Sequence, residues 1–354
     1  MKSGKEKRKK RKIRARELSN PVHHCDDEHE CSADYSDYSY VTFGSYPQSE
    51  VTDAKLIRRI EQAFDETGAI KGDVWLDGER YRKVEKIDAG YNEFFHEKGE
   101  EFYRYFKWEP IRWKVLHKND RKAFLVSVKA LDCVEYHDKN EFVAWKNCTL
   151  RKWLNGYDGY RSRRREESVV SAPFYEMAFN EEEKKAILSS TQMTGNPFHI
   201  TRDKIFLLSR DEAVNPKYGF CGNYSCYSST RWIQPTEYSH AMGVRVYADV
   251  QWAGGDLNSW VWLRASGAST YAVTYIDYSG YVFPFGKFID DRRNGVMPAL
   301  HLDLSSDTWE MVQSEPKKKP DGKPEKWQGK RAVRTNAGKF PKKADEDPPN
   351  GTDG

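Results

Sequence analysis

The spacing of hydrophobic and polar positions changes several times between residues 40 and 304, and each spacing predicts an element. Order is expected to begin at residues 40–48, where apolar and polar residues alternate up to a turn at Pro47. In residues 54–64 apolar side chains recur every three or four positions, which predicts a helix capped by Asp53. Strand-like runs follow at residues 74–87, 101–116 and 123–131, and Asp77-Gly78 predicts a hairpin turn within the first of them.

Three more short helices are predicted from residues that cap helix ends. The signals are Thr149 with a stop at Gly156, Asn180 with Glu183, and Ser209 with Glu212 after a strand that begins near residue 203. Three strand segments then close the pattern: residues 260–264, a hairpin of 271–276 and 281–285, and residues 295–304. Apolar and polar residues alternate in the last segment, which predicts one strand with one buried face.

Between these regular parts, residues 215–255 show little periodicity and contain much Gly, Ser, Tyr and Asn. Long irregular segments of compact domains are usually functional or mobile, so this one is a candidate functional loop. Residues 160–168 form a charged insertion and are expected to be a surface loop.

Charge divides the chain into three parts. Residues 1–16 carry a net charge of +9 and residues 315–354 one of +4, so with +4 for the whole chain the residues between them carry −9. We therefore expect a disordered basic and then His/Asp/Tyr-rich segment (1–40), a folded body (41–304) and a disordered Lys/Pro-rich tail (305–354). An acidic body argues against nucleic-acid binding by the body, although residues 1–16 could contact nucleic acid weakly.

Apolar runs and cysteines bear on the compartment. No apolar run is long enough to span a membrane, and the basic start is not followed by the apolar segment of a signal peptide. Six cysteines are too few for a disulfide scaffold of 354 residues. These features predict a cytoplasmic protein without membrane partners.

Eight short motifs in the body form a recognisable series. In order they are FGSYPQ (43–48), YFKWEPIRWKVL (105–116), ALDC (130–133), WKNCTLRKWLNG (145–156), AFNEEEKKAI (178–187), DKIFLLSRDEA (203–213), WVWLRASG (260–267) and GVMPALHLDL (295–304). Together they resemble an uncharacterised bacterial domain family whose members carry WWLRSPG near the end and finish with GVRPAL. That family is similar to the C-type-lectin-like fold group, which also contains formylglycine-generating enzymes and the variable proteins of diversity-generating retroelements.

The resemblance implies an α+β, C-type-lectin-like fold across residues 41–304. In this fold two short helices pack on small, twisted antiparallel sheets, and the two ends of the domain lie close together. The chain departs from the family pattern where Met297 replaces the usual Arg in the last motif, which puts any role of that Arg in doubt here.

Metal and catalytic chemistry have few candidates. Cys221 and Cys226 could hold Cu(I), as the resemblance to formylglycine-generating enzymes suggests, because thiolates are soft ligands. The segment with His23, His24, Cys25, His29 and Cys31 is either a His-rich linker or a metal site, and the Cys spacing matches no zinc module. The segment Gln234-Pro235-Thr236-Glu237 is similar to the calcium-binding loop tripeptide of C-type lectins, but it lacks the third ligand. We expect no catalytic residues, no metal and no cofactor.

Aromatic residues of the irregular loop and the following hairpin are the candidate ligand-binding residues. Tyr combined with Ser, Gly and Asn is typical of binding loops, because Tyr gives a large contact area at low entropic cost. The candidates are Tyr224, Tyr227, Trp232, Tyr238, Trp252, Tyr271, Tyr275, Tyr278, Tyr281 and Phe283. Tyr also favours half-buried strands, so core and surface both remain open for Tyr271 and Tyr275. Trp262 and Arg264 are expected to be structural, with Arg264 in an ion pair or holding backbone carbonyls.

The leading interpretation is a non-catalytic module that recognises a protein or glycan ligand. One version of it is a variable protein whose gene is diversified by a retroelement. The alternatives are a copper-dependent oxidoreductase of the formylglycine-generating type, acting through Cys221 and Cys226, and a protein associated with nucleic acid through its basic tail.

Overall fold

The computed structural model describes residues 15–25, 34–85, 103–157, 172–194, 199–247, 257–267 and 271–312. The chain divides into two units, residues 1–315 and 316–354, and every described residue belongs to the first. Residues 1–14 of the basic tail, the insertion at 160–168 and Trp252 lie outside the described residues. Within the described part, no helix is both long and apolar enough to cross a membrane.

The larger sheet has nine strands, and all of its pairs are antiparallel. Its main path follows β12 (Ile205–Phe206), β19 (Ala299–Asp303), β7 (Lys122–Ser127), β6 (Tyr103–Lys118), β3 (Tyr40–Glu50) and β20 (Glu310–Val312). Off this path, β5 (Glu79–Glu85) pairs with β6, β4 (Gly72–Leu76) pairs with β5, and β9 (Ile187–Leu188) pairs with β19. In the sequence, β3 is the first strand of this sheet and β20 is the last, yet the two strands pair directly.

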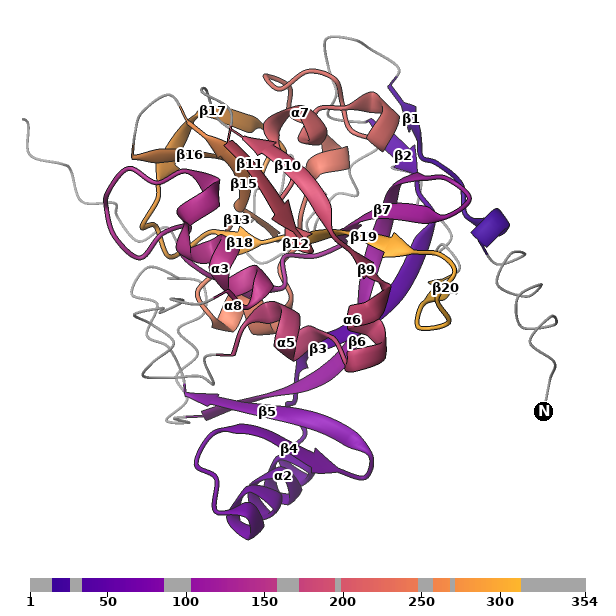
Figure 1. Cartoon of the computed structure of the whole chain (residues 1–354). Coiled ribbons are helices and arrows are strands. Elements are labelled where there is room, and N and C mark those ends of the chain that lie inside the picture. Colours follow the sequence, from indigo (N-terminus) through magenta and orange to yellow (C-terminus); the bar gives the residue numbers. More distant parts are fainter. Residues whose placement is uncertain are drawn as a thin grey trace, which may run out of the picture. The chain divides into compact units, whose positions relative to one another are not determined.

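A second sheet of five strands carries the predicted hairpin. Its order is β17 (Val282–Phe288), β16 (Ala272–Ile276), β15 (Val261–Ser266), β18 (Gly295–Val296) and β8 (Asp132–Cys133). The described part of the chain also contains three two-stranded sheets: β1 (Val22–His24) with β2 (Tyr35–Asp37), β10 (Ser190–Thr194) with β11 (His199–Asp203), and β13 (Val246–Tyr247) with β14 (Asn258–Ser259). Figure 1 shows β16 and β17 together near the upper part of the fold.

The prediction of one strand over residues 295–304 is wrong. β18 belongs to the five-stranded sheet and β19 to the nine-stranded sheet, so the chain passes from one sheet to the other at Met297 and Pro298. Pro298 has no N–H to donate to a sheet ladder, and its carbonyl accepts from the N–H of Ser127 in β7. In a strand with one buried face, alternate residues are buried. Val296 and Met297 are adjacent and both are buried, so residues 295–304 do not form such a strand.

The helices are short apart from α2. They are α2 (Ala54–Thr67), α3 (Thr149–Asn155), α5 (Phe174–Ala178), α6 (Glu181–Ala186), α7 (Arg210–Ala213) and α8 (Glu237–Ala241), with 3₁₀ turns η3 (Trp145–Asn147), η4 (Pro216–Tyr218) and η5 (Ser229–Arg231). Asp53 caps α2, and Asn180 and Ser209 form the predicted capping boxes of α6 and α7. At α3 the prediction was one residue late, because Cys148 is the N-cap and its sulfur accepts from the N–H of Arg151.

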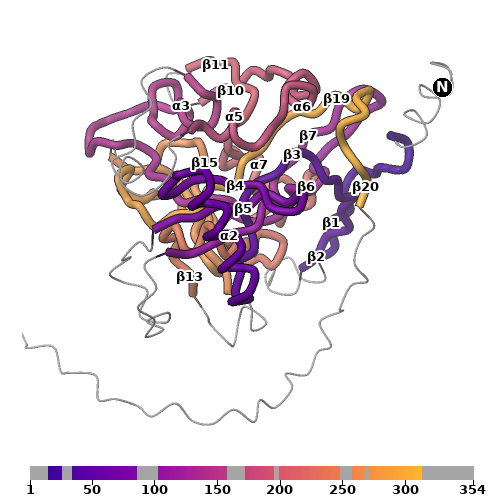
Figure 2. The backbone as a smooth tube through the Cα atoms, turned by 90° about the horizontal axis from the view of Figure 1, so that it is seen from below, coloured from indigo at the N-terminus to yellow at the C-terminus, as the bar shows by residue number. Residues whose placement is uncertain are grey.

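Two hydrophobic cores hold these elements. The main core lies among the sheets and α3, α5 and α6, and its largest fully buried side chains include Trp113, Trp145, Trp153, Trp262 and Trp309. A smaller core joins α2 to β4, β5 and β6 through Ile60, Phe64, Val74, Tyr81 and Tyr105. In both views α2 lies beside β4 and β5 (Figure 1) (Figure 2).

Ordered elements extend past both predicted boundaries of the body. β1 and β2 precede residue 41, and β20 follows residue 304. Leu18 and Trp309 explain these extensions, since each buries an apolar side chain in the main core from an otherwise polar segment. The fold is α+β, with mainly antiparallel sheets and short helices.

Candidate ligand-binding surface

The irregular loop and the hairpin turn meet at a close backbone contact. The turn of the β16–β17 hairpin contains Gly280, whose φ is +80°. A Cβ atom at this position would lie 2.1 Å from the carbonyl oxygen of Ser228 in the loop. Glycine is therefore required at residue 280, both for the left-handed conformation and for the close approach of the two segments.

Arg231 joins the same two segments from inside. Its side chain is fully buried, and its guanidinium donates to the carbonyl oxygens of Cys221 (2.8 Å), Asn223 (3.0 Å) and Cys226 (2.8 Å) in the loop. The Nε atom donates to the carbonyl of Gly280 in the turn at 2.6 Å. One rigid fork thus fixes three loop carbonyls relative to the hairpin.

Electrostatics around Arg231 are set by burial. Burial lowers the pKa of Arg231 from its ordinary value, and the nearby Cys221 thiol and Asp34 carboxylate oppose this shift.

Trp232 makes a second contact between the loop and the turn, because its indole Nε1 donates to the carbonyl of Ser279 at 3.1 Å. The loop and the turn therefore form one preorganised unit.

The segment that contains β2 also supports the loop through hydrogen bonds. The Asp34 carboxylate is buried and accepts from the hydroxyls of Ser228 (2.6 Å) and Ser229 (2.9 Å). Ser36 and Tyr38 each donate a hydroxyl to the carbonyl of Gly219 at 2.7 Å. Residues 34–38, predicted as part of a linker, are therefore a structural support of the loop.

A continuous row of rings lies on this unit, and we call Tyr227, Tyr275, Tyr281, Phe283 and Phe285 the aromatic face. Ring centroids are 6.1 Å apart for Tyr227 and Tyr281, and 5.6 Å apart for Tyr281 and Phe283. Phe283 stacks on Tyr275 at 5.2 Å and meets Phe285 at 6.2 Å. Such ring pairs hold one another in place, which lowers the entropy lost when they contact a ligand.

The ends of the aromatic face are open to solvent. Tyr227 is 55% exposed and Phe285 is 66% exposed, whereas the rings between them are partly buried. Burial also raises the pKa of Tyr275 to about 12, so its hydroxyl is protonated and able to donate at neutral pH. Tyr224, Tyr271 and Phe288, on the same loop and hairpin, are also exposed.

β17 is an edge strand that is blocked against the addition of another strand. Among the described residues it pairs with β16 alone, and the register shifts between Val273 and Tyr275 of that partner. Pro284 lacks a backbone N–H, and Gly286 has a φ of +82°, so the outer edge is interrupted. A ligand would therefore contact this edge through side chains such as Phe285 and not through a backbone ladder.

The other predicted residues divide between surface and core. Tyr224 (49%) and Tyr271 (47%) are exposed, which answers the open question for Tyr271 in favour of the surface. Tyr278 is partly buried and contacts Trp260 and Tyr247, with centroid distances of 5.0 and 4.3 Å. It is not one of the rings of the aromatic face.

Tyr238 must be removed from the list of surface candidates. Its side chain in α8 is fully buried, 5.8 Å from the ring of Tyr46 and 5.3 Å from the ring of Phe106. Composition misled the prediction, since a short helix within the irregular loop turns this side chain into the main core. Trp252 lies in the part of the loop that the structure does not describe.

Trp262 and Arg264 are both buried in the frame of the sheet. The Trp262 indole donates to the carbonyl of Val134 at 3.0 Å. Arg264 donates to the carbonyl of Leu207 at 2.6 Å and to both carboxylate oxygens of Glu212 at 2.7 and 3.2 Å. Arg264 thus makes both an ion pair and a carbonyl contact below the loop.

The list of candidate residues missed Arg231, Asp34, Phe285 and Phe288. Arg231 is the residue that pins the Tyr-rich loop, the role considered for Arg264. A single cation within the otherwise uncharged run from Tyr218 to Thr236 was the available signal for it. Asp34 and Phe288 gave no comparable signal.

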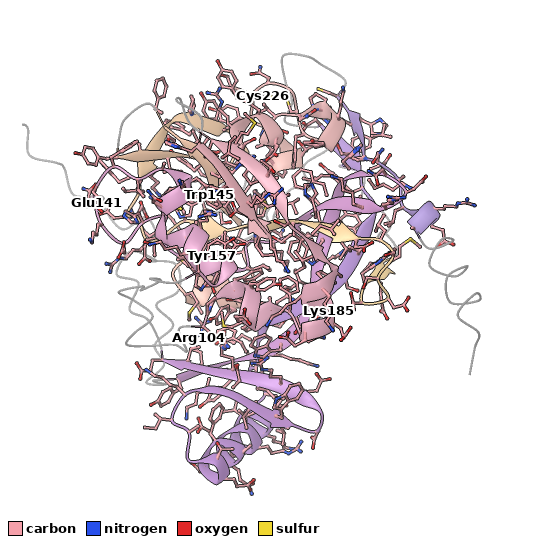
Figure 3. The ribbon with its side chains drawn as sticks, in the orientation of Figure 1. Arg104, Glu141, Trp145, Tyr157, Lys185 and Cys226 are labelled. Atoms are coloured by element: carbon pink, nitrogen blue, oxygen red, sulfur yellow. The ribbon has the colours of Figure 1, made fainter. Side chains whose placement is uncertain are left out.

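Cys221 and Cys226 lie side by side in the loop. Both thiols are buried and pack against each other. The Cys226 sulfur lies 3.5 Å from the carbonyl of Tyr227, and Cys226 is labelled at the top of the view in Figure 3. In the described residues, no three His, Cys, Asp or Glu side chains are grouped as potential metal ligands, and His29 and Cys31 lie outside them.

Comparison with known families gives one match. Residues 120–304 match the family described as a domain of unknown function, DUF6273, and this range is more than half of the 354-residue chain. The chain belongs to this family. No curated protein and no solved structure matches the chain.

The DUF6273 range contains Arg231, Gly280 and every residue of the aromatic face. Asp34 and Tyr38, which brace the loop, lie before it. β3 and β6, the neighbouring strands of the larger sheet, also lie before the DUF6273 range.

Proposed function

We propose that this chain is a non-catalytic ligand-recognition module with a C-type-lectin-like fold, and that the aromatic face binds a protein or glycan ligand. The observation that carries the proposal is a row of rings with exposed ends, built on a loop that Arg231 and Gly280 lock to the hairpin. Exposed aromatic residues on a rigid base are common at binding hot spots.

The C-type-lectin-like part of the proposal rests on the fold and on the motif series. Short helices accompany mainly antiparallel sheets, and β3 pairs with β20 so that the two ends of the domain are adjacent. A variable protein diversified by a retroelement is the more specific version. It requires a reverse-transcriptase gene beside this gene and a near-repeat of its 3′ end; a neighbourhood without either overturns that version alone.

The test uses the purified full-length chain on a glycan array and in affinity capture with an identified partner. Tyr227→Ala and Phe285→Ser should each lower affinity at least tenfold, because truncating a hot-spot ring costs about 2 kcal/mol. Trp75→Ala is the matched control, since Trp75 is 67% exposed but lies in β4, outside the aromatic face. Equal losses for all three variants, or none for the first two, would contradict the proposal.

A second candidate, a copper-dependent oxidoreductase, is supported by the contact between Cys221 and Cys226. Two thiolates are suitable ligands for Cu(I), and these two residues would hold it. Titration of Cu(I) against a competing chelator tests this candidate. If the double variant Cys221→Ser/Cys226→Ser binds Cu(I) as tightly as the native chain, the candidate is wrong.

A further inference from the structure

The thiols of Cys221 and Cys226 are enclosed by a small, well-defined loop. Their side chains are 3% and 7% exposed and form a two-member cluster separate from the main core. The four residues between them, 222–225, are all exposed. Tyr224 lies in the middle of this segment and Tyr227 follows it directly.

Arg231 holds the two cysteines close together independently of their side chains. One guanidinium carbon carries both Nη1, which binds the Cys221 carbonyl, and Nη2, which binds the Cys226 carbonyl, each at 2.8 Å. The backbones at both cysteines are therefore fixed to one small planar group. The two buried side chains also lie in one cluster, and a disulfide requires two cysteines close to each other.

The same guanidinium supplies charge. Both thiols interact electrostatically with Arg231. In thiol–disulfide exchange the attacking group is the thiolate form of cysteine. The pair thus combines proximity with a cationic environment.

We propose that Cys221 and Cys226 form a reversible disulfide by exchange with a low-molecular-weight disulfide such as glutathione disulfide. One thiolate attacks a sulfur of glutathione disulfide, which forms a mixed disulfide and releases one glutathione thiolate. The second cysteine then attacks the protein sulfur of the mixed disulfide and releases the other glutathione. The two protein thiols lose two electrons and two protons, and one glutathione disulfide gains them as two thiols.

The disulfide would close residues 221–226 into a covalent ring directly before Tyr227 of the aromatic face and so limit the motion of this part of the loop. Its formation does not depend on the proposed function, whereas its effect on ligand binding does. Failure of the disulfide would leave the recognition proposal intact, and failure of ligand binding would leave the disulfide intact.

The experiment treats the folded full-length chain with glutathione disulfide, blocks remaining thiols by alkylation, and identifies tryptic peptides by mass spectrometry. Cleavage after Lys217 and Arg231 yields one peptide, residues 218–231, that contains both cysteines. We expect this peptide to become unalkylated, lighter than the dithiol form by two hydrogen atoms, and fully restored by dithiothreitol.

Cys148 provides an internal control, because burial raises its pKa to about 12 and it should remain a thiol throughout. Cys226→Ser and Cys226→Ala should each trap a glutathione adduct on Cys221 in place of the internal disulfide. Two outcomes would overturn the proposal. In the first, residues 218–231 of the native chain keep a stable glutathione adduct and form no internal disulfide. In the second, both cysteines are still alkylated although a reference dithiol in the same solution is oxidised by the added glutathione disulfide.

Discussion

Replacing Gly280 by Ala should test whether the loop and the hairpin turn form one unit. The new Cβ would be 2.1 Å from the Ser228 carbonyl oxygen, far inside van der Waals contact. Ser228 cannot move aside freely, because it is fully buried and its hydroxyl donates to Asp34. The substitution therefore forces the loop away from the turn.

Two terms contribute to the expected loss of stability. The left-handed conformation at a φ of +80° costs a non-glycine residue about 1–2 kcal/mol. Steric overpacking against buried backbone adds about 1–3 kcal/mol. Gly280→Ala should thus lower the free energy of unfolding by about 2–5 kcal/mol.

Gly78→Ala is the matched control for the backbone term. Gly78 lies in the β4–β5 turn with a φ of +82°, and a Cβ there would meet no heavy atom within 4 Å. It should cost only the conformational term of about 1–2 kcal/mol. Urea denaturation of both variants gives the two free energies of unfolding. If they agree within about 0.5 kcal/mol, the contact between turn and loop does not have the role assigned to it.

Three further predictions concern single side chains. Arg231→Met should lower the free energy of unfolding by more than about 3 kcal/mol, because each buried carbonyl that loses its donor costs about 1–3 kcal/mol. Urea denaturation measures this loss. Arg210→Met is the control and should show no comparable loss, because the Arg210 side chain is 51% exposed. Tyr238→Ala should cost about 3–5 kcal/mol, and a melt that matches the native chain would restore Tyr238 to the surface. Burial by itself raises the pKa of Asp73, but hydrogen bonds and charge from Arg82 and Arg80 lower it overall. The stability from Asp73 is therefore present above its unfolded pKa of about 4 and is lost as pH falls through the folded value; acid titration of unfolding should be flatter for Asp73→Asn, and an unchanged slope contradicts this assignment.

Local signals along the chain predicted local structure well. Asp53, Asn180 and Ser209 cap helices as expected, since a cap requires only a side-chain oxygen and the next few backbone N–H groups. Asp77-Gly78 likewise forms its hairpin turn, with both residues at positive φ. These features depend on neighbours within four residues, so a single sequence contains the information.

Features that depend on distant partners could not be predicted in the same way. Tyr227 and Tyr238 both lie in the irregular loop predicted over residues 215–255, yet one is 55% exposed and the other is fully buried. The difference arises because Tyr46 and Phe106, far away in the sequence, form the site that takes Tyr238. The partners of Arg231 were hidden for the same reason, since one of its acceptors, Gly280, lies 49 residues away.

The family match covers only part of the larger sheet, and this has a consequence for how the protein folds. The family match begins at residue 120, between β6 and β7, which pair along five registered positions. A fragment of residues 120–304 would lack β3 and β6 and would expose the long edge of β7 to solvent. Unprotected edges of this kind promote association between chains. We expect such a fragment to aggregate. The family match begins inside the nine-stranded sheet, so its boundary is not the boundary of a unit that can fold alone.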